Sequence, residues 1–293
     1  MSKNLNVKSF LNNKKIKIID SEIISSSNLS VSFGCTCEKI YLKNGKKFVV
    51  KIQNELNAKQ YKSIYYEGKS LEIMNKKFSS LFPRILHIEK EFFIMSWIKN
   101  NGESNLYTEK DFANKLSNMH AVKGEMFGYD FNTPIGGIEQ NCDYEKSWTN
   151  FYKTKRLQMI YDLINRKNPM SSKINNGIEK IINNIEKYIP ESNRPSLIHG
   201  DLWGGNILYN NGKLAGLIDP AIQYADIEFE LSYLKFFNTV SDTFFDYYNN
   251  NVKIDKGFNE RSGIYELYHA LLNVHLWDRS YINIVNKILE RYI

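Results

Sequence analysis

The hydrophobic periodicity of this chain changes near residue 100, and the change constrains the fold more than any other sequence feature. Before it, apolar and polar residues alternate, and Asn44-Gly45 separates two apolar runs as in a β-hairpin. Three- and four-residue spacing then predicts a helix over residues 56–78, and strands are predicted at 85–88 and 92–98. We expect the first hundred residues to form a mainly antiparallel sheet with one long helix.

Beyond residue 100 the apolar residues recur mostly at helical intervals. Helices are predicted over residues 111–122, 144–165, 174–188, 227–237, 265–277 and 281–293. Three short apolar runs between Pro195 and Pro220, separated by Gly-rich or Asn-Gly turns, break this pattern and predict a small β-insert. The expected fold class is α+β, with an antiparallel-sheet lobe at residues 1–98 and a mostly helical lobe at residues 99–293.

The composition excludes several classes of protein. With 14% aromatic residues and only six prolines, the chain is not expected to be disordered. Basic residues outnumber acidic ones by 39 to 32, but the lysines are scattered and no nucleic-acid-binding motif occurs, so nucleic acid is not an expected partner.

Three cysteines, a small and odd number, favour a reducing compartment. No secretory signal and no apolar run of about 18 residues occurs, so we expect a cytoplasmic protein without a membrane partner. The oligomeric state stays open.

The segment between the two prolines carries a string of polar residues with a specific chemical use. It reads His199-Gly200-Asp201-Leu202-Trp203-Gly204-Gly205-Asn206, and Asp219 follows thirteen residues later. The interval of five from Asp201 to Asn206 matches the catalytic loop of protein kinases, in which the aspartate accepts the proton of the acceptor hydroxyl. Asn206 and Asp219 supply oxygen ligands of the kind that hold Mg²⁺ against the phosphates of ATP. Loops also collect Asp, Asn and Gly for conformational reasons, but the complete string favours phosphoryl transfer.

Other parts of the chain supply candidates for binding ATP. Lys51 ends the second strand of the hairpin, and Glu67 lies early on the next helix, so we expect Lys51 to bind the phosphates and Glu67 to hold it. The loop that covers the phosphates is expected within residues 25–37, where Gly34 is the only glycine. Ser96-Trp97-Ile98 ends a strand where two lobes would join, and its backbone is the candidate adenine hinge. These residues would serve equally well as core.

Two cysteines, Cys35 and Cys37, lie in or beside the expected phosphate loop. The simpler interpretation is that they are small strand residues, because most buried cysteines are inert. A redox switch is the alternative, since a bound anion and nearby amides could alter the reactivity of a thiol.

Taken together, these motifs resemble the fructosamine (ketosamine) kinase family, a branch of the protein-kinase-like aminoglycoside and choline phosphotransferase superfamily. The discriminating residues are Trp203 after Asp-Leu and Pro220-Ala221 after the metal aspartate. Further segments similar to the family's signatures are Phe127-Gly128, Ile135-Gly136, Gln140-Asn141, Trp148, Phe151-Tyr152, Arg156-Leu157, Asp255-Lys256-Gly257-Phe258, Arg261, Tyr265-Glu266-Leu267-Tyr268-His269 and Leu272-Asn273. The similarity therefore extends over nearly the whole chain.

This resemblance implies an ATP-binding lobe at residues 1–98 and a catalytic and substrate lobe at residues 99–293. It implies ATP- and Mg²⁺-dependent phosphorylation of a sugar hydroxyl in ketosamines, which are small-molecule or protein-bound adducts of sugars and amines. Phosphorylation makes such adducts unstable, so the implied role is deglycation. The alternatives are an aminoglycoside- or choline-type phosphotransferase and a pseudokinase that serves as a binding module. The pseudokinase is disfavoured because all four catalytic positions carry the expected residue.

Together with this resemblance, three further residues are assigned roles around Asp201. Trp203 is a candidate wall for the sugar, although a core aromatic that locks the loop is an equal alternative. His199 is expected to brace the loop. Glu230 stands where the superfamily usually has an aspartate that braces the catalytic loop, and a glutamate would serve with a longer reach.

Overall fold

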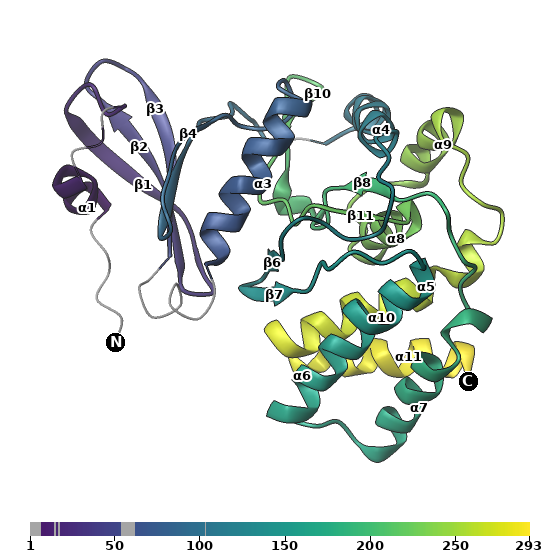
Figure 1. Cartoon of the computed structure of the whole chain (residues 1–293). Helices are drawn as coiled ribbons and strands as arrows, with labels where there is room; N and C mark the ends of the chain where they lie inside the picture. Colours follow the sequence, from purple (N-terminus) through teal and green to yellow (C-terminus); the bar gives the residue numbers. More distant parts are fainter. Residues whose placement is uncertain (1–6, 15, 17, 54–61, 103) are drawn as a thin grey trace. The chain divides into compact units, whose positions relative to one another are not determined.

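The computed structural model describes the whole chain except residues 1–6, 15, 17, 54–61 and 103 (Figure 1). The chain folds into two compact units. Unit 1 comprises Met1–Glu103, Thr133–Glu139 and Ile207–Ala221, and unit 2 comprises Ser104–Asn132, Gln140–Asn206 and Ile222–Ile293. The sequence predicts a single boundary after residue 98, and that boundary stays a prediction.

Unit 1 is built on a five-stranded antiparallel sheet with the strand order β1-β2-β3-β5-β4. The strands are β1 (Ile23–Ser32), β2 (Cys35–Leu42), β3 (Lys47–Gln53), β4 (Ile85–Ile88) and β5 (Phe92–Ser96). The turn between β2 and β3 places Gly45 at a φ of +83°, a conformation that glycine adopts without a steric penalty. The predicted hairpin at Asn44-Gly45 is therefore confirmed.

Among the described residues of unit 1, two helices pack on this sheet. Helix α3 (Ser63–Lys77) buries Leu71 and Met74, and it lies alongside the strands in Figure 1. The first part of the helix predicted over residues 56–78, residues 56–61, lies outside the described residues. Helix α1 (Val7–Lys14), which the sequence reading missed, buries Val7 and Leu11 against apolar residues of the sheet.

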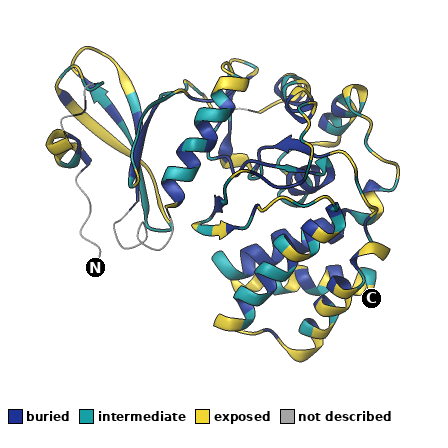
Figure 2. Cartoon of the chain, viewed as in Figure 1, coloured by how far each residue is buried: buried dark blue, intermediate teal, exposed yellow. Residues whose placement is uncertain are grey.

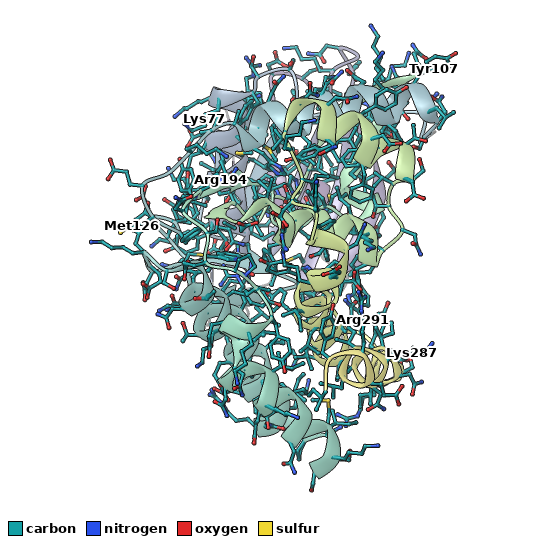
Figure 3. All side chains as sticks on the ribbon, turned by 90° about the vertical axis from the view of Figure 1, so that its right-hand side faces the viewer. Lys77, Tyr107, Met126, Arg194, Lys287 and Arg291 are labelled. Carbon is teal, nitrogen blue, oxygen red and sulfur yellow. The ribbon has the colours of Figure 1, made fainter. Side chains whose placement is uncertain are left out.

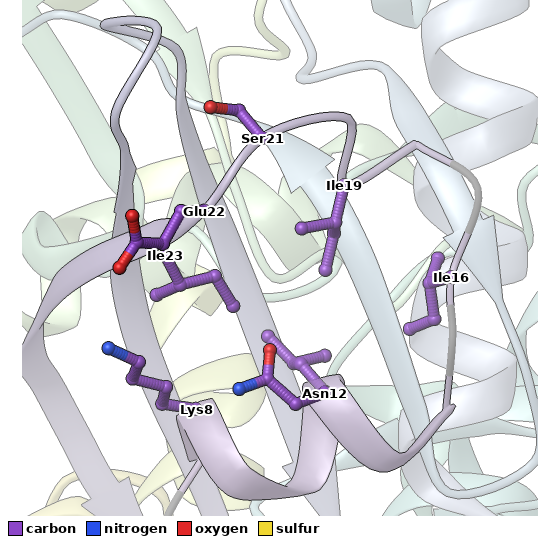
Figure 4. Close-up of a pocket in the computed structure, with 8 residues that line it drawn as sticks. Lys8, Asn12, Ile16, Ile19, Ser21, Glu22 and Ile23 are labelled. Carbon is purple, nitrogen blue, oxygen red and sulfur yellow. The ribbon is translucent and has the colours of Figure 1, made fainter.

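A cavity of about 520 Å³ opens between α1 and the start of β1 (Figure 4). Apolar side chains such as Leu11 and Ile23 line it together with Lys8 and Glu22. None of the residues singled out from the sequence lines this cavity, so it is separate from the candidate site.

Two short hairpins complete the strands of unit 1. They are β6 (Thr133–Ile135) with β7 (Ile138–Gln140), and β9 (Ile207–Asn210) with β10 (Lys213–Leu217). The β9–β10 hairpin is tied to unit 1 by Leu217 N–H, which donates to Leu81 O at 2.8 Å. The three strands predicted between Pro195 and Pro220 are therefore present, but they do not form one sheet: the first, β8 (Ser196–Ile198), pairs with β11 (Gln223–Ala225) in unit 2.

Unit 2 is mainly helical, as predicted. Its helices are α4 (Leu106–His120), α5 (Trp148–Phe151), α6 (Met159–Lys167), α7 (Ser172–Asn183), α8 (Ile227–Phe236), α9 (Asp242–Asn251), α10 (Phe258–Leu276) and α11 (Ile282–Tyr292). The single helix predicted over residues 144–165 is divided, because a π-helical segment, Tyr152–Gln158, separates α5 from α6. Helix α9 was not predicted, and α10 begins before the predicted residue 265.

The core of unit 2 is centred on α8 and α10, whose buried faces are dark blue in Figure 2. Trp148 lies within this core and donates from Nε1 to the hydroxyl of Tyr265 at 3.0 Å. Asp226 caps α8, because its side chain accepts a hydrogen bond from the backbone of Glu228 at 2.9 Å. This cap fixes where α8 begins and hence which of its side chains reach the loop that follows β8.

Exposed charges on unit 2 are dispersed. Figure 3 shows Arg194 well apart from Lys287 and Arg291, which both belong to α11. Among the described residues, every helix is too short or too polar to pass through a lipid bilayer.

Gly128, in unit 2, occupies a position that only glycine can fill. Gly128 exchanges two backbone hydrogen bonds with Tyr224 of β11, the strand that pairs with β8. Its φ is +116°, and a Cβ at this position would lie 2.5 Å from the backbone oxygen of Cys142. Both the backbone conformation and the space therefore require glycine here.

We expect Gly128→Ala to lower the free energy of unfolding by about 2–4 kcal/mol, because backbone strain and a clash with a backbone atom add together. Gly212→Ala is the matched control, since Gly212 also has a positive φ of +73° but nothing lies within 4 Å of its added Cβ. It should cost only about 1 kcal/mol. Urea unfolding of both variants measures the difference, and equal losses would contradict the steric explanation.

Candidate active site

Unit 1 brings together three residues that the sequence places far apart. The Nζ atom of Lys51, on β3, donates to both carboxylate oxygens of Glu67 on α3, each at 2.8 Å. The same Nζ donates to Oδ2 of Asp219 at 2.9 Å. The structure thus brings the two predicted residues Lys51 and Glu67 into contact, and Asp219 is a second carboxylate partner of Lys51.

The environment keeps Lys51 positively charged. Its side chain is only 12% exposed, and burial alone would lower its pKa. The attraction of Asp219 and Glu67 outweighs this effect and raises the pKa of Lys51 well above its usual value. The result is a fixed cation of the kind that binds phosphate oxygens.

Asp219 adopts an unusual backbone conformation. Its φ is +55°, in the left-handed region that residues other than glycine seldom enter. Such a conformation costs on the order of 1 kcal/mol and is typical of functional sites. The Asp219 side chain contacts Lys51 and is 33% exposed, so it is more accessible to a ligand than Lys51 or Glu67.

Unit 2 holds the loop around Asp201. Strand β8 ends at Ile198, and a 3-10 turn, Gly204–Asn206, closes the loop. The Nδ2 atom of Asn206 donates to the backbone oxygen of Asp201 at 2.8 Å and to its Oδ2 at 3.1 Å. On the other carboxylate oxygen, Oδ1, the hydroxyl of Tyr233 donates at 2.7 Å. The predicted interval of five residues therefore corresponds to direct contact between Asp201 and Asn206.

The buried carboxylate of Glu230 holds the backbone at the start of this loop. The oxygens of Glu230, on α8, accept hydrogen bonds from His199 N–H at 3.1 Å and from Gly200 N–H at 2.6 Å. The Nε2 atom of His120 lies 2.8 Å from Glu230, and its Nδ1 lies 2.6 Å from the hydroxyl of Tyr248. A Glu230 carboxylate is satisfied if Nε2 donates to it, in which case Nδ1 accepts from Tyr248. The expected brace is present, and the glutamate spans the distance to two successive amides.

His199 and Trp203 take different positions in this loop. His199 is fully buried, and its Nδ1 accepts a hydrogen bond from Asp201 N–H at 3.2 Å, which agrees with the predicted bracing role. Trp203 is 48% exposed, so it is not the core aromatic that was the alternative. Its ring covers Gly205, where an added Cβ would lie 2.3 Å from the indole.

The expected phosphate loop is shorter than the sequence suggests. Most of residues 25–37 belong to strands β1 and β2, and only Phe33 and Gly34 form the turn between them. Both have positive φ, 49° and 74°, which is typical of a tight two-residue hairpin. Gly34 thus lies at the hairpin tip.

Two of the three hinge candidates, Ser96 and Ile98, already form hydrogen bonds within the protein. The backbone N–H of Ser96 donates to Arg84 O at 2.9 Å, and its Oγ accepts from Arg84 N–H at 2.9 Å. The N–H of Ser96 is therefore not available to an adenine ring. The backbone oxygen of Ile98 accepts from Asn100 Nδ2 at 3.1 Å. Trp97, whose ring faces Lys39 Nζ at 3.6 Å, follows the end of β5 and stays a candidate.

Carboxylate and amide oxygens suit a hard cation such as Mg²⁺, which is usually bound through one or two carboxylates together with substrate phosphates. Asp219 in unit 1 and Asn206 in unit 2 each carry such an oxygen. Among the described residues there is no group of three or more His, Cys, Asp or Glu side chains that could hold a metal ion by itself.

The sequence reading missed three residues that contact this machinery. His120, on α4, contacts Glu230, and Tyr248, on α9, contacts His120. Tyr233, on α8, contacts Asp201. Each is separated from its partner by more than 30 residues. The spacing of Tyr233 three residues after Glu230 was the one available signal, because side chains at that interval share a helix face.

The two cysteines near the hairpin tip are partly buried, and their surroundings disfavour the thiolate. Burial raises the pKa of the Cys35 thiol to about 11 and that of Cys37 to about 12, despite the opposing charge of Lys51. Thiolate is the reactive form. The structure therefore favours small strand residues over a redox switch.

We expect Cys35 and Cys37 to react with iodoacetamide at pH 7.5 at least about tenfold more slowly than an ordinary thiol, because so little thiolate is present. The rate should rise with pH up to about pH 11, and urea-unfolded protein is the control. Peptide mass mapping after timed quenching measures both sites. Rapid modification in the folded protein would restore the redox hypothesis.

Comparison with known proteins agrees with this geometry. A solved structure named "putative fructosamine-3-kinase", from Thermobifida fusca, has a TM-score of 0.82 at 21% identity and covers 93% of this chain and 94% of its own. An ADP-bound aminoglycoside phosphotransferase has a TM-score of 0.65 at 16% identity, covering 98% and 97%. These likenesses confirm the predicted protein-kinase-like α+β fold.

The sequence relatives point to one family. A probable ketoamine kinase of Enterococcus faecium is 27% identical over 208 residues, which cover 70% of this chain and 73% of the relative. The model of the fructosamine kinase family matches residues 11–293. The predicted resemblance is confirmed: this chain is a kinase that belongs to the fructosamine kinase family.

Proposed function

We propose that this chain transfers the γ-phosphoryl group of ATP to a sugar hydroxyl of a ketosamine. The observation that carries the proposal is Asp201, which follows β8 in a loop whose backbone is held by Glu230 and whose carboxylate is oriented by hydrogen bonds. A fixed carboxylate next to an acceptor hydroxyl is what phosphoryl transfer requires of a kinase.

Unit 1 supplies the candidates for binding ATP. Lys51, held by Glu67, is a buried cation that would bind the phosphates. Gly34 at the hairpin tip would bring backbone amides near them, and the backbone of Trp97 would meet the adenine. The ADP in the related aminoglycoside phosphotransferase supports a nucleotide for this fold. We assign residues 1–98 to the ATP-binding lobe and residues 99–293 to the catalytic and substrate lobe.

Asn206 and Asp219 would hold Mg²⁺. When bound, the ion neutralises charge on the phosphates during transfer. Asp219 would have to exchange its hydrogen bond with Lys51 for this role, at least in part, and the partial exposure of its side chain supports that exchange.

The acceptor reaction itself depends on Asp201 and Trp203. Asp201 would accept the proton of the substrate hydroxyl while that oxygen bonds to the γ-phosphorus and ADP leaves. Trp203 presents an exposed aromatic face that would lie against the C–H face of the sugar.

The choice of ketosamine over other acceptors is supported by family membership and by the names of the relatives. Trp203 and the match to residues 11–293 both disfavour an aminoglycoside or choline acceptor.

We place the reaction in the cytoplasm, since all three cysteines are free thiols. The ketosamine would be free or protein-bound.

We expect ADP release in the presence of ATP and Mg²⁺ with fructosyl-, ribulosyl- or erythrulosyl-lysine, because the ketosamine supplies the hydroxyl that Asp201 deprotonates. Kanamycin and choline are the matched acceptors that test the alternatives. A coupled ADP assay and mass detection of the phosphorylated adduct measure the result. Turnover of kanamycin or choline alone would reject the ketosamine assignment.

We expect Asp201→Asn to keep ATP affinity while kcat falls by about three or more orders of magnitude, because the proton acceptor is lost. Lys51→Met is the comparison variant, and it should weaken ATP binding itself. Calorimetric titration with ATP and the ADP assay separate the two effects. Near-normal kcat for Asp201→Asn would refute the assigned role.

A further inference from the structure

The hydroxyl of Tyr233 contacts Asp201, and no sequence motif predicts this contact. It lies 2.7 Å from Oδ1 of Asp201. Burial and the charge of Asp201 raise the pKa of Tyr233 well above its usual value, so the hydroxyl keeps its proton. Tyr233 is therefore the donor and the Asp201 carboxylate the acceptor.

The ring of Tyr233 is held in place by its neighbours. Its centroid lies 4.4 Å from that of His269 and 4.9 Å from that of Phe237, to which it is perpendicular, and the residue is only 6% exposed. Burial lowers the pKa of His269 to about 3, so this imidazole is neutral and adds no competing charge. The hydroxyl cannot swing away from Asp201 without disturbing this packing.

Helix α8 holds the catalytic loop at two points. Glu230 accepts hydrogen bonds from the backbone of His199 and Gly200, and Tyr233 lies three residues later on the same helix face. One contact fixes the backbone of the loop, and the other fixes the side chain of the residue that follows. Both depend on the single rigid helix that Asp226 caps.

A second anchor matters because the carboxylate of an aspartate turns easily about χ2, whose energy wells are broad. Asn206 holds Oδ2 and Tyr233 holds Oδ1, so the plane of the Asp201 carboxylate is defined at both ends. A carboxylate oxygen carries two lone pairs, so accepting one hydrogen bond is compatible with accepting a proton. We propose that Tyr233 is a positioning residue that fixes the plane of the Asp201 carboxylate for proton transfer. The proposal rests on the proposed function, in which Asp201 accepts that proton.

The test is the variant Tyr233→Phe, which removes the hydroxyl and keeps the ring. We expect kcat to fall about tenfold or more, while KM for ATP changes less than about twofold, because one charge-assisted hydrogen bond is lost without altering Lys51. The matched control is Tyr152→Phe. The Tyr152 hydroxyl is also buried and donates to Ile264 O at 2.6 Å, far from Asp201 in the hydrogen-bond network. Its loss should lower stability similarly but leave kcat near that of the wild type.

A double-mutant cycle makes the result independent of the acceptor. Urea unfolding of Tyr233→Phe, Asp201→Ala and the double variant should show a coupling energy between the two side chains, whereas Tyr152→Phe should show none with Asp201→Ala. In an Asp201→Asn background, Tyr233→Phe should cause little further loss of kcat, since both act on one step.

The outcomes separate this proposal from the proposed function. If the wild type phosphorylates kanamycin or choline but no ketosamine, the proposed substrate is rejected, and the kcat ratio for Tyr233→Phe is measured on that acceptor. If no acceptor is phosphorylated, the unfolding cycle alone decides whether the hydroxyl is coupled to Asp201, and zero coupling overturns the proposal. Unchanged kcat in Tyr233→Phe, or an equal loss in Tyr152→Phe, also overturns it.

Discussion

The buried carboxylate of Glu230 is the interaction on which the catalytic loop of unit 2 depends. Its side chain is 1% exposed, so as an ion it must be compensated within the protein, because an unpaired buried charge costs several kcal/mol. Two backbone amides of the loop and the ring of His120 supply that compensation. The backbone amides of the loop therefore stabilise the Glu230 carboxylate, and the carboxylate in turn holds the loop backbone in place. This mutual dependence couples the conformation around Asp201 to the packing of α4, α8 and α9.

Unit 1 uses charge in the opposite way. Lys51 is a cation with two carboxylate partners, Glu67 from a helix and Asp219 from the end of a hairpin. Glu67 is as buried as Lys51, whereas Asp219 keeps a third of its side chain exposed. Of the two carboxylates, Asp219 is therefore the one that a ligand reaches more easily. A phosphate arriving at Lys51 would compete with Asp219 alone and would leave the support from Glu67 intact.

Much of this could be predicted because it is local in sequence or fixed by chemistry. The hairpin at Asn44-Gly45, the helical character after residue 100 and the loop from Asp201 to Asn206 follow from spacing and turn residues. The three short strands between Pro195 and Pro220 are also present, but their partners could not be predicted, because strand pairing is decided by tertiary contacts: β8 and β9 are neighbours in sequence but pair with different strands. Tyr233, like His120 and Tyr248, could not be assigned, since a tyrosine in an apolar helix is ordinary until its partner, 32 residues away, is placed beside it.

The contact between Trp203 and Gly205 has a consequence for how the acceptor preference of this chain could change. The indole occupies the space that any side chain at position 205 would need. A substitution there would displace the exposed ring, and under the proposed function this would move the surface against which the sugar lies while Asp201 stays unchanged. Positions 203 and 205 would thus have to change together during evolution. A pair of small substitutions is then a short route by which such an enzyme could acquire a different acceptor while its phosphoryl-transfer chemistry stays the same.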